Sequence, residues 1–167
     1  MTLPTVLLGA TIGATAFVLA AEETTAGALA LMRLAICGIA LGVAAATDLT
    51  EHRVPNRVVL PAAAGCAALT LVGDESLHAV MWGLALAASL LVLSLVRPSV
   101  LGMGDVKLVL LVAVGLDGNA ASGILLGIVF AGLAGLALLA LSGRRAWRRA
   151  LPLAPFLAIG ALAALLL

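Results

Sequence analysis

Seven apolar segments, separated by short polar stretches, occupy almost the whole chain and constrain its fold more than any other feature. Their approximate bounds are 3–21, 26–47, 58–72, 77–96, 106–116, 120–141 and 151–167. A soluble domain is about half apolar and about a quarter charged. This chain of 167 residues is 64% hydrophobic and 10% charged, too few polar side chains to cover a surface in water. The pattern predicts an all-α, polytopic transmembrane helix bundle of six to seven segments.

Two of the segments raise specific expectations. The fifth, 106–116, is shorter than the about 20 residues usually needed to cross a bilayer. Either its helix begins before Gly102, or the segment lies inside the bundle and away from lipid. The sixth carries two glycine pairs, which are expected to allow close helix packing. These pairs are Gly123/Gly127 and Gly132/Gly135.

The distribution of charge predicts the orientation in the membrane. With a cytoplasmic N-terminus, eight bases fall on the cytoplasmic side and five acids outside, as the positive-inside rule requires. The bases are Arg53, Arg57, Arg97, Lys107, Arg144, Arg145, Arg148 and Arg149, and the acids are Glu22, Glu23, Asp74, Glu75 and Asp117. Arg33 is the exception, and we expect it to pair with the nearby acids or to reach the surface. The prediction is a multi-pass protein of the cytoplasmic (inner) membrane, N-terminus in and C-terminus out.

Two aspartates stand out in this topology. Asp48 lies at the cytoplasmic end of the second segment and Asp105 at the cytoplasmic start of the fifth, so both lie at the same membrane depth. Glu51 is the only rival on that side, and it lies in a polar loop where a solvated charge is ordinary. Charged groups beside apolar membrane segments are costly and usually have a function. We therefore expect Asp48 and Asp105 to act together.

Paired carboxylates have a recognisable chemistry. Two carboxylates that approach closely share one proton. The ionised member then takes a proton from water while the protonated member hydrogen-bonds a peptide carbonyl, which is general acid–base catalysis by one residue type. Asp48 lies near a helix C-terminus, which disfavours a carboxylate, whereas Asp105 is expected near a helix N-terminus, which favours one. This position predicts that Asp48 more often holds the shared proton, provided that the fifth helix does not begin before Gly102.

The polar motifs around these aspartates resemble those of a known family. Asp48 is followed after six residues by Pro55-Asn56, and the stretch Gly102-Met103-Gly104-Asp105-Val106-Lys107 comes later. Together they resemble the type IV prepilin peptidases, which are membrane aspartyl proteases of the GxGD type. The segment 151–158 is also similar to a Pro-Phe-Gly-Pro-Phe-Leu-Ala segment of that family, with departures at Leu153 and Ala154; we assign it no chemistry. The resemblance covers about residue 33 to the C-terminus.

The resemblance implies a role for each matching residue. Asp48 and Asp105 would form the catalytic pair, and Gly102 and Gly104 would shape the loop beside Asp105. Three roles are open for Lys107: holding Asp105 ionised, attracting the leader, or anchoring the helix at the interface, which we favour. We expect Pro55 and Asn56 to set the start of the third helix, with Asn56 as its cap. His52 is expected to be a solvated loop residue.

The resemblance also implies the substrate: a membrane-inserted prepilin or pseudopilin-like protein, cut after a short basic leader at the cytoplasmic interface. Large bacterial members of the family carry an N-terminal domain with CxxC motifs and also methylate the product; we expect no such domain in this chain. It is similar to the short forms that serve tight-adherence pili and archaeal flagella. We expect one peptidase domain over residues 1–167, and cleavage without methylation.

The composition limits which cofactors and partners we expect for this chain. No metal or other cofactor is implied, because no His/Cys/Asp/Glu cluster has ligand spacing. Cys37 and Cys66 are expected to be small buried core residues. The net charge of +1 and the lack of a basic, aromatic patch give no sign of nucleic-acid binding. Membrane lipid is the expected surrounding.

Three other functions compete with this interpretation. Presenilin-type proteases also use GxGD, but their first motif requires a tyrosine and this chain has none. A small transporter or ion-coupled subunit would use Asp48 and Asp105 as an ion or proton site, and would not cleave peptides. A non-catalytic assembly factor would not need both aspartates.

Overall fold

The structure is a computed structural model that describes residues 3–22, 27–72, 77–97, 102–142 and 151–167. Within these ranges it contains seven α-helices, one short 3-10 helix and no strand. The helices are α1 (Leu3–Glu22), α2 (Ala28–Glu51), α3 (Asn56–Val72), α4 (Leu77–Val96), α5 (Met103–Gly115), α6 (Ala120–Ser142) and α7 (Ala154–Leu166), and the 3-10 helix is η1 (Asp117–Asn119). The predicted all-α bundle is confirmed.

The helices have the length and composition of membrane segments. Among the described residues, two stretches are long and apolar enough to cross a bilayer, Ala28–Glu51 and Asp117–Leu141. Shorter apolar helical stretches accompany them at Pro4–Ala20, Asn56–Val72, Met81–Val96 and Ala154–Leu166. Many large apolar side chains, such as Leu8, Trp82 and Leu136, are exposed on the outside of the bundle. A membrane supplies the apolar surroundings that such a surface requires.

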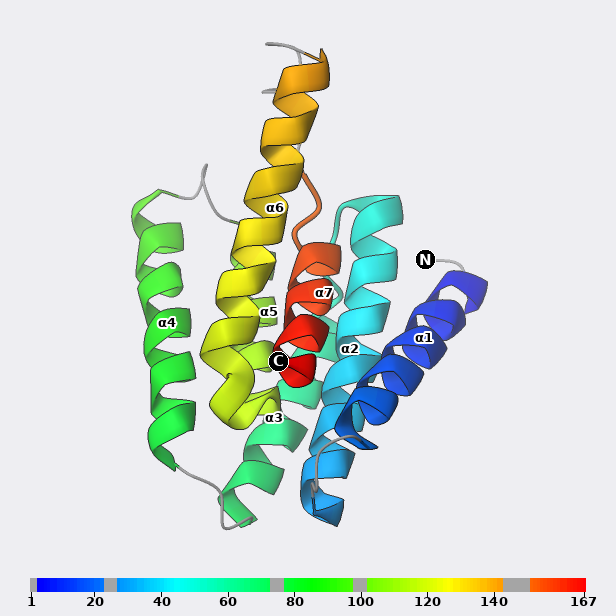
Figure 1. Cartoon of the computed structure of the whole chain (residues 1–167), viewed down its shortest axis with the longest axis vertical. Helices are drawn as coiled ribbons and strands as arrows, with labels where there is room; N and C mark the ends of the chain where they lie inside the picture. Colours follow the sequence, from blue (N-terminus) through cyan, green and yellow to red (C-terminus); the bar gives the residue numbers. More distant parts are fainter. Residues whose placement is uncertain (1–2, 23–26, 73–76, 98–101, 143–150) are drawn as a thin grey trace.

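Consecutive helices run in opposite directions along the bundle (Figure 1). In that view α2, α4 and α6 run upward, while α1, α3, α5 and α7 run downward. The end of α2 and the start of α5 therefore lie at the same end of the bundle, as predicted for Asp48 and Asp105. The α5–α6 connection, which contains Asp117, lies at the opposite end.

The short helix α5 lies inside the bundle, which decides between the two expectations for this segment. It begins at Met103, with Gly102 as its N-cap, and eight of its thirteen residues are buried. It packs against α2, α3, α4, α6 and α7. Because α5 is surrounded by other helices, it does not need the length of a helix that spans lipid alone.

Glycines allow α1 and α2 to approach closely. A Cβ atom added to Gly9 would lie 2.5 Å from the carbonyl oxygen of Gly42 and one added to Gly38 would lie 2.6 Å from that of Gly13. Both helices present glycines four residues apart, Gly9/Gly13 and Gly38/Gly42, which is a known spacing for close helix contact in membranes. The sequence analysis singled out neither pair.

The two glycine pairs of α6 behave differently. A Cβ on Gly127 would lie 2.9 Å from the Cα atom of Leu157, and one on Gly123 would lie 3.2 Å from that of Ala161. This pair packs against α7, as predicted. The prediction is wrong for Gly132, which has nothing within 4 Å of an added Cβ, and for Gly135, whose nearest contact is a leucine side chain at 3.9 Å.

Arg33 is held inside the bundle, and the expectation that it reaches the surface is wrong. Its side chain is buried, and Nη1 donates a hydrogen bond of 3.3 Å to Oγ1 of Thr70. The Thr70 hydroxyl also lies 3.3 Å from the carbonyl oxygen of Val114. Arg33 thereby links α2, α3 and α5 at the end of the bundle away from Asp48. Cys37 and Cys66 are buried and free nearby, as predicted.

Several charges used to predict the orientation lie outside the described residues. They are Glu23, Asp74, Glu75, Arg144, Arg145, Arg148 and Arg149.

Candidate active site

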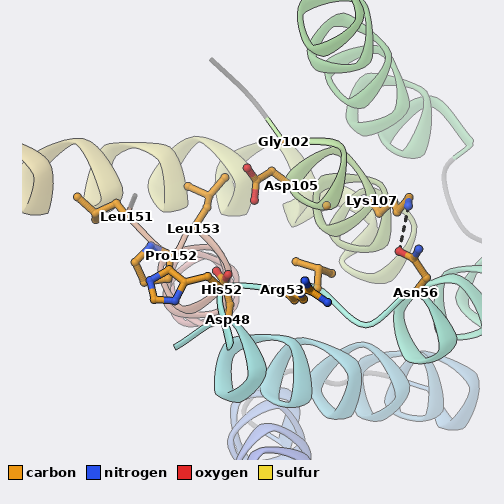
Figure 2. A pocket seen from close by; sticks show the side chains of 12 residues that line it. Asp48, His52, Arg53, Asn56, Gly102, Asp105, Lys107, Leu151, Pro152 and Leu153 are labelled. Carbon is orange, nitrogen blue, oxygen red and sulfur yellow. Dashed lines mark hydrogen bonds between the residues drawn. The ribbon is translucent and has the colours of Figure 1, made fainter. Parts of the chain in front are cut away.

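A polar pocket of about 430 Å³ opens at the end of the bundle where α2 ends and α5 and α7 begin. Its walls come from the α2–α3 connection, the first turns of α3 and α5, and the residues just before α7 (Figure 2). The lining residues are Asp48, His52, Arg53, Val54, Asn56, Gly102, Gly104, Asp105, Lys107, Leu151, Pro152 and Leu153. Of the predicted site residues, the pocket gathers Asp48, Asp105, Gly102, Gly104, Lys107 and Asn56, and leaves out Pro55.

Asp48 is fixed by the ends of two helices. Helix α2 continues three residues beyond Asp48, to Glu51, so Asp48 lies in its last turn. The backbone carbonyl of Asp48 accepts a hydrogen bond of 3.0 Å from the N–H of His52, which caps the helix in the left-handed conformation (φ 52°). The side chain is 7% exposed. Its Oδ2 accepts a hydrogen bond of 3.0 Å from the backbone N–H of Ala154, the first residue of α7.

Asp105 enters the same pocket from the first turn of α5. Its backbone N–H donates a hydrogen bond of 3.1 Å to the carbonyl of Gly102, which begins the helix. The side chain is half-buried and lies beside the Gly102 backbone, so a Cβ added there would be 3.4 Å from Oδ2 of Asp105. Figure 2 shows both aspartates facing the space in front of Leu153. Both carboxylates line the same pocket.

Glycine at position 104 allows α5 to begin against the α2–α3 connection. A Cβ added to Gly104 would lie 3.1 Å from Cγ2 of Val54. This distance is tighter than an ordinary van der Waals contact, so a larger residue would push the first turn of α5 outward. Gly104 thus helps to place Asp105 opposite Asp48.

Lys107 and Asn56 form a pair that the sequence analysis did not predict. Nζ of Lys107 donates a hydrogen bond of 2.9 Å to Oδ1 of Asn56, drawn as a dashed line in Figure 2. Both residues line the pocket. Asn56 is the first residue of α3 and binds Lys107 instead of capping that helix. The predicted role of Pro55 is confirmed, since its carbonyl accepts the N–H groups of Val58 and Val59 at 3.0 and 3.1 Å.

Sequence reasoning missed one wall of the pocket. Leu151, Pro152 and Leu153 line it, and the next residue, Ala154, binds Asp48. His52 also lines the pocket, although we expected it to be a solvated loop residue; its side chain is exposed. The prolines on either side of Leu153 and Ala154 were the available signal, because they indicate a fixed helix start.

The family model described as the type IV leader peptidase family matches residues 35–141. The chain belongs to the type IV leader peptidase family. The comparisons with curated proteins and with solved structures gave no match. The matched range contains both Asp48 and Asp105, while the segment from Leu151 to Ala154 lies beyond it.

As a member of the type IV leader peptidase family, this protein carries a pocket suited to acid–base chemistry. One buried and one half-buried carboxylate share a space that water can enter. Among the described residues, no group of three or more His, Cys, Asp and Glu side chains is placed to hold a metal ion. The ionisable side chains that line the pocket are the two carboxylates, the basic side chains of Arg53 and Lys107, and the imidazole of His52.

Proposed function

We propose that this leader peptidase is a membrane-embedded aspartyl endopeptidase whose catalytic pair is Asp48 and Asp105. One observation carries the proposal: two acids from helices far apart in sequence line the same polar pocket of an otherwise apolar bundle. The family match supports peptide-bond cleavage over the alternative of an ion-coupled transporter.

Hydrolysis by such a pair needs one ionised and one protonated carboxyl group. The ionised carboxylate accepts a proton from water, whose oxygen attacks the scissile carbonyl carbon. The protonated carboxyl hydrogen-bonds the carbonyl oxygen and stabilises the charge that develops there. A pocket of about 430 Å³ has room for a water molecule and for an extended segment of peptide.

The substrate we propose is a prepilin or pseudopilin-like protein with a short basic leader. Such a leader would meet the negative charge of the catalytic pair, while the apolar helix that follows it would remain in the lipid beside the bundle. The scissile bond then lies at the level of the pocket, where water has access. Arg53, Arg57 and Lys107 come from the helix ends around the pocket, which supports a pocket that faces the cytoplasm.

A cleavage assay in proteoliposomes tests this function. The substrate is a prepilin-like peptide with a basic leader, and the variants are Asp48→Asn and Asp105→Asn, which keep the side-chain shape and remove the acid. We expect each change to reduce cleavage by at least 10³-fold, the order seen when a member of a catalytic unit is removed. The matched control is Glu51→Gln, an exposed acid in the same last turn of α2 that does not line the pocket.

The control should cleave at the wild-type rate. Activity that survives either aspartate change would exclude that residue from the chemistry. If folded wild-type protein cleaves none of several leaders, but carries ions or protons in a manner that depends on Asp48 and Asp105, the transporter interpretation replaces this one.

A further inference from the structure

The amino end of α7 is attached directly to Asp48. The backbone N–H of Ala154 donates a buried hydrogen bond of 3.0 Å to Oδ2 of the aspartate. Ala154 is the first residue of α7, with Leu153 as the N-cap, and its side chain is fully buried. The first N–H groups of a helix have no partner inside it, since the first internal bond of α7 runs from Leu157 N–H to the Leu153 carbonyl. Asp48 thus satisfies one of these open donors.

This contact bears on which aspartate is ionised. The end of α2 carries partial negative charge and disfavours a carboxylate at Asp48, whereas the start of α7 carries partial positive charge and favours one. Asp105 lies in the first turn of α5, and that helix start favours a carboxylate there as well. The contact with α7 adds a buried N–H donor directly on the carboxyl oxygen of Asp48, which the C-terminus of α2 cannot offer. The sequence alone shows α2 but does not show that α7 meets it here.

We propose that the amino end of α7 is part of the active site, where the Ala154 N–H holds Asp48 as the ionised base while Asp105 carries the shared proton. The proposal rests on the proposed function. Ala154 is a positioning residue, since its backbone acts through Asp48. This assignment reverses the one suggested by the position of Asp48 at the end of α2 alone.

The chemical step then has a defined direction. Asp48 accepts a proton from water as the water oxygen bonds to the scissile carbonyl carbon. Asp105 gives its proton to the carbonyl oxygen, so the product of this step is a neutral gem-diol. The pair has exchanged roles, with Asp48 protonated and Asp105 ionised. As the C–N bond then breaks, Asp48 gives its proton to the leaving nitrogen and Asp105 takes a hydroxyl proton from the gem-diol, so that an amine and a carboxylic acid are released and both aspartates regain their starting states.

The charged groups that face Asp48 are few. In the part of the chain that the structure describes, the titratable side chains lining the pocket with Asp48 are His52, Arg53, Asp105 and Lys107. The residues of α7 and its preceding segment, 151–167, include no titratable side chain. The influence of α7 on Asp48 is therefore that of its backbone, and it can be removed without changing any side-chain charge.

An ester bond between Leu153 and residue 154 removes the N–H donor to Asp48. It also weakens the Leu153 carbonyl, which accepts the N–H of Leu157. Semisynthesis of the segment 151–167 allows Ala154 to be replaced by lactic acid, which keeps the methyl group and the chain geometry. A proline at 154 would remove the same N–H, but Leu153 has helical torsion angles (φ −83°, ψ −28°) that are disfavoured before proline. The matched control is an ester at Leu157, which loses the backbone hydrogen bond to the Leu153 carbonyl but keeps the Ala154 N–H that binds Asp48.

The two limbs of the pH–activity profile distinguish the two assignments. If Asp48 is the ionised base, loss of the N–H raises the midpoint of the acid limb by about one pH unit, the scale of one backbone hydrogen bond to a carboxylate. The alkaline limb stays in place, because Asp48 is ionised on both sides of that transition. If Asp48 instead carries the proton, the alkaline limb rises and the acid limb stays.

We expect the ester at 154 to shift the acid limb alone and the ester at 157 to shift neither limb. A shift of the alkaline limb, or no shift, would overturn the proposal. An infrared titration of the carboxyl bands of the same proteins, without substrate, gives two midpoints. The ester at 154 should raise the lower midpoint, which corresponds to the acid limb, and leave the upper one in place. This titration decides the proposal even if no substrate is cleaved, so that its failure and the failure of the proposed function are distinguishable.

Discussion

Nζ of Lys107 lies 2.9 Å from Oδ1 of Asn56, and this hydrogen bond joins the first two turns of α5 to the start of α3. Lys107 lies two residues after Asp105, and Asn56 follows the connection that leaves α2 just beyond Asp48. The bond therefore connects the two parts of the chain that follow Asp48 and Asp105. We infer that it fixes the width of the pocket rather than taking part in proton transfer.

This inference predicts coupled effects of Lys107→Met and Asn56→Ala. Each change should lower the free energy of unfolding by about 1 kcal/mol, the usual net contribution of one hydrogen bond. The double variant should be no less stable than the worse single variant, because both changes remove the same bond. Chemical unfolding in detergent measures all three. Additive losses in the double variant would show that the two side chains act independently. The control is Arg57→Met, which removes an exposed base in the same turn of α3.

Gly104 predicts a steric effect on activity. Gly104→Ala places a Cβ 3.1 Å from Cγ2 of Val54 and should displace the first turn of α5 by a few tenths of an ångström. Because small misplacement of a catalytic group is costly, we expect cleavage to fall about tenfold. Val54→Ala in the same protein removes Cγ2 but leaves Cβ of residue 54, 3.2 Å from the added atom, so it should restore part of the rate. A loss that Val54→Ala does not relieve at all would contradict this explanation.

The α1–α2 contact predicts opposite signs for the same substitution at two helical glycines. Gly42→Ala directs a Cβ into the Gly9 backbone and should destabilise the protein by about 1–3 kcal/mol, as overpacking usually does. Gly132→Ala meets nothing within 4 Å and should be neutral or stabilise by about 0.5 kcal/mol, since alanine is the better helix former. Thermal unfolding in detergent compares the two. Equal effects would mean that α1 and α2 are not packed as described.

Much of this architecture was predictable from the sequence, and the reason is the membrane. Apolar runs must be helical in lipid, so the seven segments and their alternating direction follow from hydropathy. The common end of Asp48 and Asp105 follows from that alternation. The start of α5 at Met103 was left open in the sequence, because the length of a buried helix is not set by the bilayer.

The features that the sequence did not predict depend on contacts between segments far apart in the chain. Ala154 binds Asp48 through its backbone, and a backbone donor leaves no trace in residue type. Lys107 and Asn56 were each assigned a local role, an anchor and a cap, because both roles are common for those residues; the structure pairs them with each other. Arg33 was expected to pair with the nearby acids or to reach the surface, because nothing in the sequence marks Thr70, in another apolar run, as its hydrogen-bond partner.

The pair of Arg33 and Thr70 predicts a loss of stability without a change in catalysis. Thr70→Val keeps the shape of the side chain but removes a buried hydroxyl that hydrogen-bonds Nη1 of Arg33 and reaches the carbonyl of Val114. Weakening the solvation of a buried charge should lower the free energy of unfolding by about 1–3 kcal/mol. Thr11→Val is the control, because Thr11 is exposed and its hydroxyl bonds only carbonyls of its own helix. Both limbs of the pH–activity profile should stay in place in the folded Thr70→Val protein, since Arg33 lies at the end of the bundle away from Asp48. Equal losses in the two variants, or a moved limb, would show that Arg33 does more than hold three helices together.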